Sequence, residues 1–212
     1  MTSDLHHAVL VVVDVQNDFC PGGSLEVKGG DSIVPIINRL MPMFPLVVAT
    51  QDWHPADHVS FASNHSGGKP FDTIQVRGIS QVLWPDHCMQ GTRGADFHPS
   101  LENIHFRLIL RKGTKPTLDS YSAFYENDKK TLTGLSSYLK GMGVQDVYLC
   151  GLATDVCVYH SAMDSVRLGF HTFLIQDAAR GVDVPEGSLS RAIQDMKSSG
   201  VHVIESAEVL RS

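Results

Sequence analysis

The chain has 212 residues, of which 42% are hydrophobic and 19% charged. This length and balance fit one α/β domain over residues 1–212 and exclude a disordered chain. Lys and Arg number 17 and Asp and Glu 23, a net charge of −6 without basic runs, which argues against a nucleic-acid partner.

Short aliphatic runs alternate with stretches of helical periodicity along the chain. We expect strands at 9–13, 46–49, 107–110, 147–150, 172–175 and 201–204. Helical faces are predicted from Ile33, Ile36, Ile37 and Leu40, from Leu132, Leu135 and Leu139, and from Val156, Tyr159, Met163 and Val166 after a Thr154 N-cap. This order predicts an α/β fold, a mostly parallel sheet of about six strands with helices on both faces.

The segment from Gln51 to about His98 interrupts this alternation. It has little periodicity and is rich in Gly, Pro, His and Trp. A loop region of this length inside a compact domain is usually functional.

The N-terminal residues and the cysteines point to a reducing compartment. No basic segment precedes the apolar run Ala8–Val13, which is too short for a signal sequence or a membrane span. We therefore expect a cytoplasmic protein without a membrane partner. The cysteines Cys20, Cys88, Cys150 and Cys157 form no CxxC pair, so they are predicted to be free thiols, and one could be catalytic.

Three reactive side chains follow predicted strands. Asp14 follows the first strand, Lys112 follows the strand at 107–110, and Cys157 lies shortly after the strand at 147–150. Ligands of open parallel sheets bind beyond the carboxyl ends of the strands. We therefore expect these three side chains at one edge of the sheet.

This set suits nucleophilic attack on a carbonyl. With Thr154 as N-cap, Cys157 occupies the third helical position, where the helix dipole stabilises a thiolate and free N–H groups can hold an oxyanion. Asp14 could take the thiol proton, and Lys112 could stabilise negative charge. Separately, Cys157 could be a small buried hydrophobe, Asp14 a turn cap and Lys112 a solvated strand end.

A carboxylate and histidines with metal-ligand spacing follow the second strand. Asp52 and His54 are two residues apart, so in an extended segment both side chains reach the same side, and His87 offers a third ligand. One carboxylate and two imidazoles suit one divalent ion, Zn²⁺ or Fe²⁺/Mn²⁺. Alternatively, these histidines hydrogen-bond to loop carbonyls. His58 could be a ligand or could orient a ligand through a hydrogen bond.

Several motifs in this order resemble the nicotinamidases of the isochorismatase-like hydrolase superfamily. The resemblance covers nearly the whole chain. Its landmarks are the segments at 13–19 (VDVQNDF), 51–55 (QDWHP), 84–88 (WPDHC), 111–113 (RKG), 119–124 (DSYSAF) and 151–158 (GLATDVCV).

The resemblance implies a role for each motif. Asp14, Lys112 and Cys157 would be the catalytic triad, and the amides of Ala153 and Cys157 the oxyanion hole beside a cis Leu152–Ala153 peptide. Asp52, His54 and His87 would bind the metal. Phe19 and Trp84 would sandwich a pyridine ring, with Tyr121 or Phe124 closing the pocket. The expected reaction is hydrolysis of a small-molecule amide, nicotinamide, to nicotinate and ammonia in NAD salvage, with pyrazinamide as a further substrate.

Two alternatives remain open from the sequence. The first is a metal-independent cysteine hydrolase of the same superfamily that acts on a carbamoyl or ureido compound. The second is a non-catalytic metal-binding or redox-sensing protein in which Cys157 is an oxidisable switch. The sequence does not fix the oligomeric state, although small α/β enzymes often form homodimers.

Overall fold

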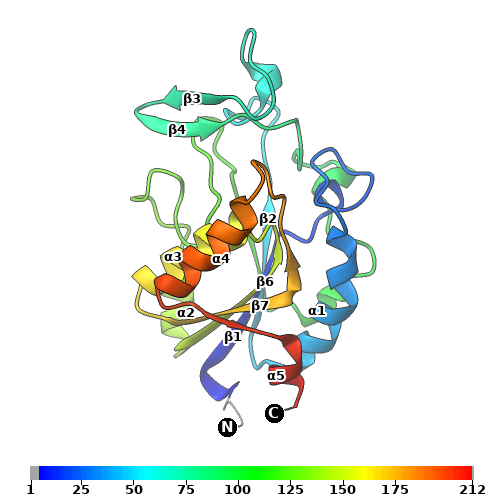
Figure 1. The fold of residues 1–212 in the computed structure, drawn as a ribbon, viewed down its shortest axis with the longest axis vertical. Coiled ribbons are helices and arrows are strands. Elements are labelled where there is room, and N and C mark those ends of the chain that lie inside the picture. The colour runs from blue at the N-terminus through cyan, green and yellow to red at the C-terminus, as the bar shows by residue number, and fades with distance from the viewer. Residues whose placement is uncertain (1–4, 212) are drawn as a thin grey trace.

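The valine-rich run near the N-terminus forms the centre of the sheet. In the computed structural model, which describes residues 5–211, β1 (Ala8–Val13) is buried along its whole length. It pairs in parallel with β2 (Val47–Asp52) and β6 (Asp146–Leu152). The parallel strands β5 (Leu108–Lys112), β7 (His171–Arg180) and β8 (His202–Ile204) complete the order β5-β2-β1-β6-β7-β8 (Figure 1). The predicted six-stranded sheet is confirmed.

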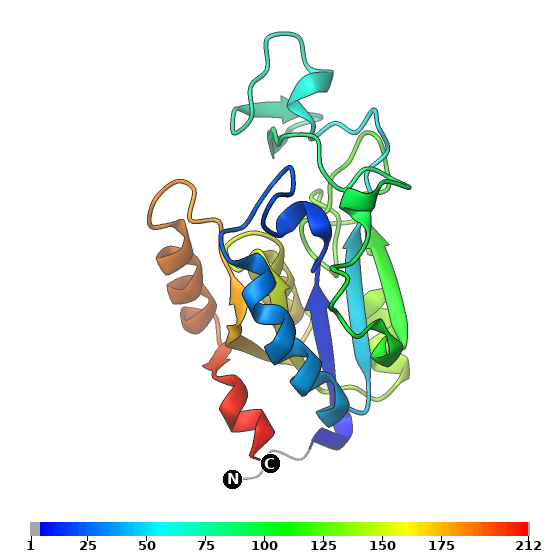
Figure 2. The same cartoon turned by 90° about the vertical axis from the view of Figure 1, so that its right-hand side faces the viewer.

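Helices cover both faces of this sheet because successive strand residues point to opposite faces and both sets of side chains are apolar. Leu10 and Val12 pack in one cluster with α1 (Val34–Leu40) and α5 (Ser206–Leu210). Val9 and Val11 point to the opposite cluster, which contains α2 (Leu135–Gly141), α3 (Cys157–Arg167) and α4 (Ser188–Ser198). Figures 1 and 2 show the two helical layers on either side of the strands. This arrangement confirms the predicted α/β fold class.

The segment predicted as a loop contains a second, small sheet. Strand β3 (Thr73–Val76) pairs antiparallel with β4 (Ile79–Val82), and the hairpin stands above the carboxyl ends of the main sheet (Figure 1). Its turn residues Arg77 and Gly78 both have positive φ, 52° and 80°, as a two-residue type I′ hairpin turn requires. The available signal was the alternation of Ile74 and Val76 with polar residues, followed by a glycine-containing turn and a second short run that contains Ile79 and Val82.

Helix α3 begins two residues later than predicted. Its N-cap is Val156 and its first residue is Cys157, so the predicted Thr154 N-cap is wrong. The N–H of Thr154 instead donates to the carbonyl of Arg180 at the end of β7, at 2.8 Å, which holds Thr154 against the sheet. Cys157 still lies in the first turn. The Leu152–Ala153 peptide is cis, as the resemblance implies.

The strand order places a topological switch point between β1 and β6. The chain moves from β1 outward to β2 and β5, then returns to the other side of β1 as β6. A crevice forms where neighbouring connections leave in opposite directions, beyond the carboxyl ends of the strands. Asp14 follows one of these two strands and Cys157 follows the other.

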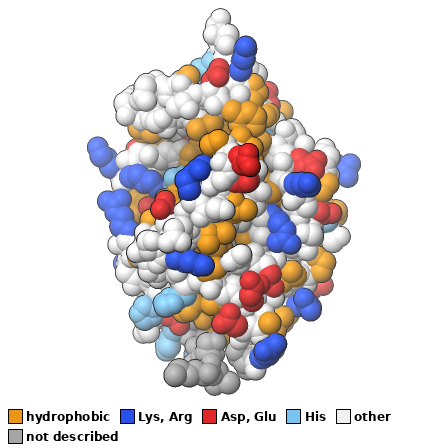
Figure 3. All heavy atoms as spheres, viewed as in Figure 1, with side chains coloured by type: hydrophobic (Ala, Val, Ile, Leu, Met, Phe, Trp, Pro, Cys, Tyr) orange, Lys and Arg blue, Asp and Glu red, His pale blue; other side chains and the backbone are white. Residues whose placement is uncertain are grey.

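Charged side chains are spread over the surface of this fold. On the face seen in Figure 3, Lys and Arg are interspersed with Asp and Glu. Among residues 5–211, no helix has both the length and the apolar character needed to cross a membrane.

Close backbone contact between β1 and β6 yields a testable prediction. Gly151 has φ 111°, and a Cβ there would lie 2.1 Å from the carbonyl oxygen of Val13. Gly169 has a similar φ of 87° but open space around it. Gly169→Ala should therefore cost about 1 kcal/mol of backbone strain, whereas Gly151→Ala should cost at least about 2 kcal/mol more.

Thermal unfolding of the two variants measures this difference. We expect the melting temperature of Gly151→Ala to lie about 4–8 °C below that of Gly169→Ala, given about 2–4 °C per kcal/mol at this chain length. Equal melting temperatures would show that the β1–β6 contact relaxes without cost.

Candidate active site

The three reactive side chains predicted at the strand ends meet in one buried cluster. Lys112 Nζ lies 2.8 Å from Asp14 Oδ2 and 3.4 Å from Cys157 Sγ. A carboxylate oxygen of Asp14 lies within 4.8 Å of the Cys157 sulfur. All three side chains are buried. The sheet therefore brings together a candidate nucleophile, a candidate base and a cation, as the positions in the sequence predict.

Lys112 is surrounded by acceptors. Besides Asp14 and Cys157, its ammonium group contacts Asp52 Oδ1 and the carbonyl of Ser120, the latter at 3.1 Å. Burial alone would favour the neutral amine, but Asp14 and Asp52 outweigh it and raise the pKa of Lys112 well above its usual value. The group is therefore a fixed positive charge at physiological pH.

Burial and the neighbouring charges prepare Asp14 to exchange a proton. Burial raises the pKa of Asp14 to about 6, with Lys112 opposing and Asp52 adding to the shift. Thr50 Oγ1 donates to Asp14 Oδ1 at 2.7 Å and holds the carboxyl in place. Burial also raises the pKa of the Cys157 thiol, although Lys112 opposes it. The resting cysteine is therefore a thiol, beside a carboxylate able to accept its proton near neutral pH.

Two backbone N–H groups beside Cys157 are available to a ligand. Within the part of the chain that the structure describes, the N–H groups of Ala153 and Cys157 donate to no carbonyl or side chain. Val156 and Val158, in contrast, both donate to the carbonyl of Ala153. Free N–H groups at a helix start are suited to hold a developing oxyanion.

The predicted metal ligands form a second cluster that shares Asp52 with the first. Each of these residues, Asp52, His54 and His87, is buried and offers one potential ligand atom. The three ligand atoms lie within 4.8 Å of one another. Asp52 Oδ2 is 3.6 Å from His54 Nε2 and 3.9 Å from His87 Nε2. Although burial opposes ionisation, Lys112 and then His54 hold the pKa of Asp52 well below its usual value. A carboxylate and two imidazoles thus point to one centre.

The orientation of both histidines fits a bound cation. His54 Nδ1 lies 2.9 Å from the carbonyl of Gly113, and His87 Nδ1 lies 2.7 Å from the carbonyl of Pro85. Because a carbonyl only accepts, each Nδ1 carries a proton and each Nε2 faces the common centre. Although burial opposes it, Asp52 raises the pKa of His54, so a bound cation would replace a proton at its Nε2. Burial, followed by the charge of His54, lowers the pKa of His87 to about 4, so its imidazole is neutral at pH 7. The donor set suits Zn²⁺, Fe²⁺ or Mn²⁺.

His58 lies beside this cluster with a different set of contacts. Its ring stacks on His54 with centroids 4.2 Å apart, and its Nδ1 is 2.7 Å from Ser60 Oγ. Among the described residues its buried Nε2 has no hydrogen-bond partner, and it faces Asp119 Oδ1 at 4.0 Å. Sequence reasoning gave no role to Asp119, although the residue opens one of the landmark motifs. His54, His58 and Asp119 form an alternative group of three potential ligands.

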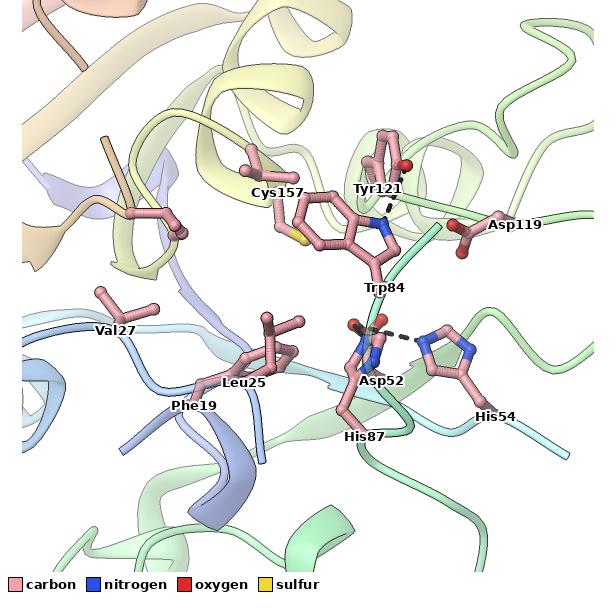
Figure 4. Close-up of a pocket in the computed structure, with 13 residues that line it drawn as sticks. Phe19, Leu25, Val27, Asp52, His54, Trp84, His87, Asp119, Tyr121 and Cys157 are labelled. Atoms are coloured by element: carbon pink, nitrogen blue, oxygen red, sulfur yellow. Dashed lines mark hydrogen bonds and ion pairs between the residues drawn. The ribbon is translucent and has the colours of Figure 1, made fainter. Parts of the chain in front are cut away.

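A pocket connects the two clusters. Its lining includes Asp52, His54, His87 and Cys157 together with the predicted ring-binding residues Phe19, Trp84 and Tyr121 (Figure 4). Leu25, Val27 and Val182 add apolar surface that was not predicted. Phe124, the alternative to Tyr121, is fully buried in the hydrophobic cluster that contains α2, α3 and α4, and it does not line the pocket. The pocket therefore offers aromatic walls beside a thiol and a potential cation site.

Comparison with known proteins places this chain in a family. The Isochorismatase domain model matches residues 8–208. The nicotinamidase of Acinetobacter baylyi is 51% identical over 97% of this chain and 95% of its own length. The nicotinamidase of Escherichia coli is 41% identical, over 90% and 91%. A solved Acinetobacter baumanii nicotinamidase and pyrazinamidase has 51% identity and a TM-score of 0.95, over 98% of this chain and 100% of that one. The chain belongs to the isochorismatase-domain family.

Proposed function

We propose that this protein hydrolyses nicotinamide to nicotinate and ammonia. The observation that carries the proposal is one aromatic-walled pocket that holds the Cys157 thiol and the Asp52, His54 and His87 side chains. The similar proteins of A. baylyi and E. coli bear the name nicotinamidase. A structure of PnC1 from L. infantum, 37% identical, was solved in complex with nicotinate. A Mycobacterium tuberculosis relative, 36% identical, is named nicotinamidase/pyrazinamidase, which supports pyrazinamide as a second substrate.

Asp52, His54 and His87 would hold one divalent ion. A pyrazinamidase of Pyrococcus horikoshii, 37% identical to this chain, was crystallised with zinc, which supports a metal but does not choose among Zn²⁺, Fe²⁺ and Mn²⁺. When bound, such an ion supplies Lewis acidity and can fix the orientation of a pyridine nitrogen. The aromatic rings of Phe19 and Trp84 would hold the ring between them.

Acylation would use the buried cluster around Lys112. Asp14 takes the proton of the Cys157 thiol, and the thiolate attacks the amide carbon. The N–H groups of Ala153 and Cys157 hold the oxyanion, and Lys112 limits the cost of negative charge in the buried cluster. Asp14 then returns its proton to the nitrogen as the C–N bond breaks, and ammonia leaves a thioester behind.

Deacylation would reverse these roles with water as the nucleophile. Asp14, ionised again, takes a proton from the water as its oxygen attacks the thioester carbon. The same two N–H groups hold the second oxyanion. The C–S bond breaks to leave nicotinic acid, which loses its remaining proton to solvent and departs as nicotinate, and the Cys157 thiolate recovers its proton from Asp14. Each turnover therefore consumes one water and leaves the protein unchanged.

The first prediction concerns the metal. Purified protein should release ammonia from nicotinamide, and prior treatment with a chelator should remove most of this activity. Adding back Zn²⁺, Fe²⁺ or Mn²⁺ to the chelated protein should restore it, and elemental analysis should find about one ion per chain. Activity that survives complete chelation would contradict the metal's role. Failure of metal-loaded protein to act on nicotinamide would overturn the proposed function and favour carbamoyl or ureido substrates.

The second prediction concerns the nucleophile. Cys157→Ala should lower kcat for nicotinamide by at least about 10⁴-fold, because the covalent step has no substitute, while nicotinate still binds. Cys20→Ala serves as the matched control, since Cys20 is also a buried thiol but lies outside the pocket lining. Ammonia release and nicotinate titration measure both effects. Wild-type turnover by Cys157→Ala would remove Cys157 from this role.

The third prediction concerns pH. Because the pKa of Asp14 is raised to about 6, its ionised, proton-accepting form predominates above pH 6 and is lost as the pH falls through 6. We expect kcat/KM to fall about tenfold for each pH unit below 6. Circular dichroism over the same range separates this effect from acid unfolding. A value of kcat/KM that stays constant from pH 5 to 7 would contradict Asp14 as the base.

A further inference from the structure

Gln81 is a buried amide that connects the β3–β4 hairpin to the pocket wall. The residue is 2% exposed, although most of the hairpin is partly or fully exposed. Its Nε2 lies 2.8 Å from the carbonyl of Val82, 2.9 Å from Asp119 Oδ2 and 3.2 Å from the Tyr121 hydroxyl. The carbonyl of Val82 can only accept, so the amide nitrogen, not the amide oxygen, must occupy this position. Gln81 is therefore fixed as a donor.

The Tyr121 hydroxyl is placed between two groups that cannot accept its proton. Trp84 Nε1 lies 3.1 Å from the hydroxyl oxygen, and Gln81 Nε2 lies 3.2 Å from it. An indole N–H and an amide NH₂ only donate. The two amide hydrogens of Gln81 are shared among Val82, Asp119 and this hydroxyl oxygen. Because neither Gln81 Nε2 nor Trp84 Nε1 can accept, the hydrogen of the Tyr121 hydroxyl is directed elsewhere. Within residues 5–211, no side chain or carbonyl accepts this hydrogen. Burial also raises the pKa of Tyr121 well above its usual value, so the hydroxyl keeps its proton at neutral pH.

The geometry places this donor near the reacting end of the pocket. Tyr121 lines the pocket, and its ring stacks on His160 at 5.3 Å. His160 lies one turn after Cys157 on α3. In Figure 4, Tyr121 and Cys157 lie on one side of Trp84, and Asp52, His54 and His87 lie on the other. A ligand whose ring nitrogen faces the histidines would place its carboxamide or carboxylate on the Tyr121 side.

We infer that Gln81 is a positioning residue for the substrate, which acts by holding the Tyr121 hydroxyl as a hydrogen-bond donor to the oxygen of the reacting carboxamide or of the product carboxylate. This inference rests on the proposed function, because it takes the ligand to be a planar aromatic amide or its acid. It gives the hairpin a part in binding, although no residue of the hairpin is in the pocket lining itself.

The test compares Tyr121→Phe, Gln81→Met and the double variant in metal-loaded protein. Tyr121→Phe removes only the hydroxyl, and Gln81→Met keeps the length but removes the donors. A buried neutral hydrogen bond is worth about fivefold in affinity. We expect Tyr121→Phe to raise KM for nicotinamide and Kd for nicotinate about fivefold, and Gln81→Met to raise both about threefold, with kcat within about twofold of wild type.

The double variant tests whether Gln81 acts through Tyr121. If it does, adding Gln81→Met to Tyr121→Phe should change Kd for nicotinate by less than about 1.5-fold. Gln75→Met is the matched control, because Gln75 is an exposed glutamine on the same hairpin, and it should leave both constants unchanged. If Gln81→Met does not fold, Gln81→Asn, which is too short to keep the contact with Tyr121, replaces it in the same cycle.

Three results would overturn the inference. These are unchanged constants in Tyr121→Phe, a loss in kcat without a change in KM or Kd, or fully multiplicative losses in the double variant, which would mean that Gln81 acts through Asp119. Wild-type ammonia release separates this failure from failure of the proposed function. If the metal-loaded wild type neither turns over nicotinamide nor binds nicotinate, the proposed function fails, and the inference that rests on it is overturned as well.

Discussion

The buried ammonium group of Lys112 is the constraint on which the rest of the site depends. It is placed among Asp14, Asp52 and Cys157 with its side chain fully removed from solvent. Removing one partner from a buried ion pair typically costs about 3–5 kcal/mol, because the remaining charge has no compensation. One cation cannot balance two carboxylates, however. Burial, with the charge of Asp52 adding to it, raises the pKa of Asp14, so Asp14 would be the carboxyl that exchanges a proton. Although Asp52 is also buried, Lys112 and His54 keep it ionised.

The sheet register makes this arrangement rigid. Asp52 and Lys112 are the last residues of β2 and β5 and lie directly opposite each other in the parallel pairing. Their contact is therefore set by backbone hydrogen bonds and not by the loops. Gln16 adds a second restraint, because its amide group both donates to the carbonyl of Asp52 and accepts from the N–H of Asp52. Since Asp52 also points to His54 and His87, the nucleophile cluster and the candidate metal cluster share one fixed carboxylate.

Local sequence patterns predict those features of the molecule that depend on short-range periodicity, such as the strands and the positions of their ends. The aliphatic runs predicted all six strands of the main sheet, and the strand ends predicted that Asp14, Lys112 and Cys157 meet. Other features depend on contacts that no local pattern encodes. Thr154 was expected to cap α3. Instead, its N–H donates to the carbonyl of Arg180 and holds the residue beside the end of β7. Helix α4 was missed although Ala192 and Met196 mark a buried face. Gln81 is one polar residue among several in the hairpin, and only its tertiary contacts distinguish it.

The loops beyond the sheet determine which atoms of the site face a ligand. The carbonyls of Gly113 and Pro85 accept from Nδ1 of His54 and His87, so both Nε2 atoms point to Asp52. This requires backbone in direct contact with the ring of His54, since a Cβ at position 113 would lie 2.3 Å from His54 Cε1. Gly113 immediately follows Lys112. One short segment at the end of β5 thus supplies the central cation and orients a candidate metal ligand, which explains why a glycine with φ 61° follows the lysine.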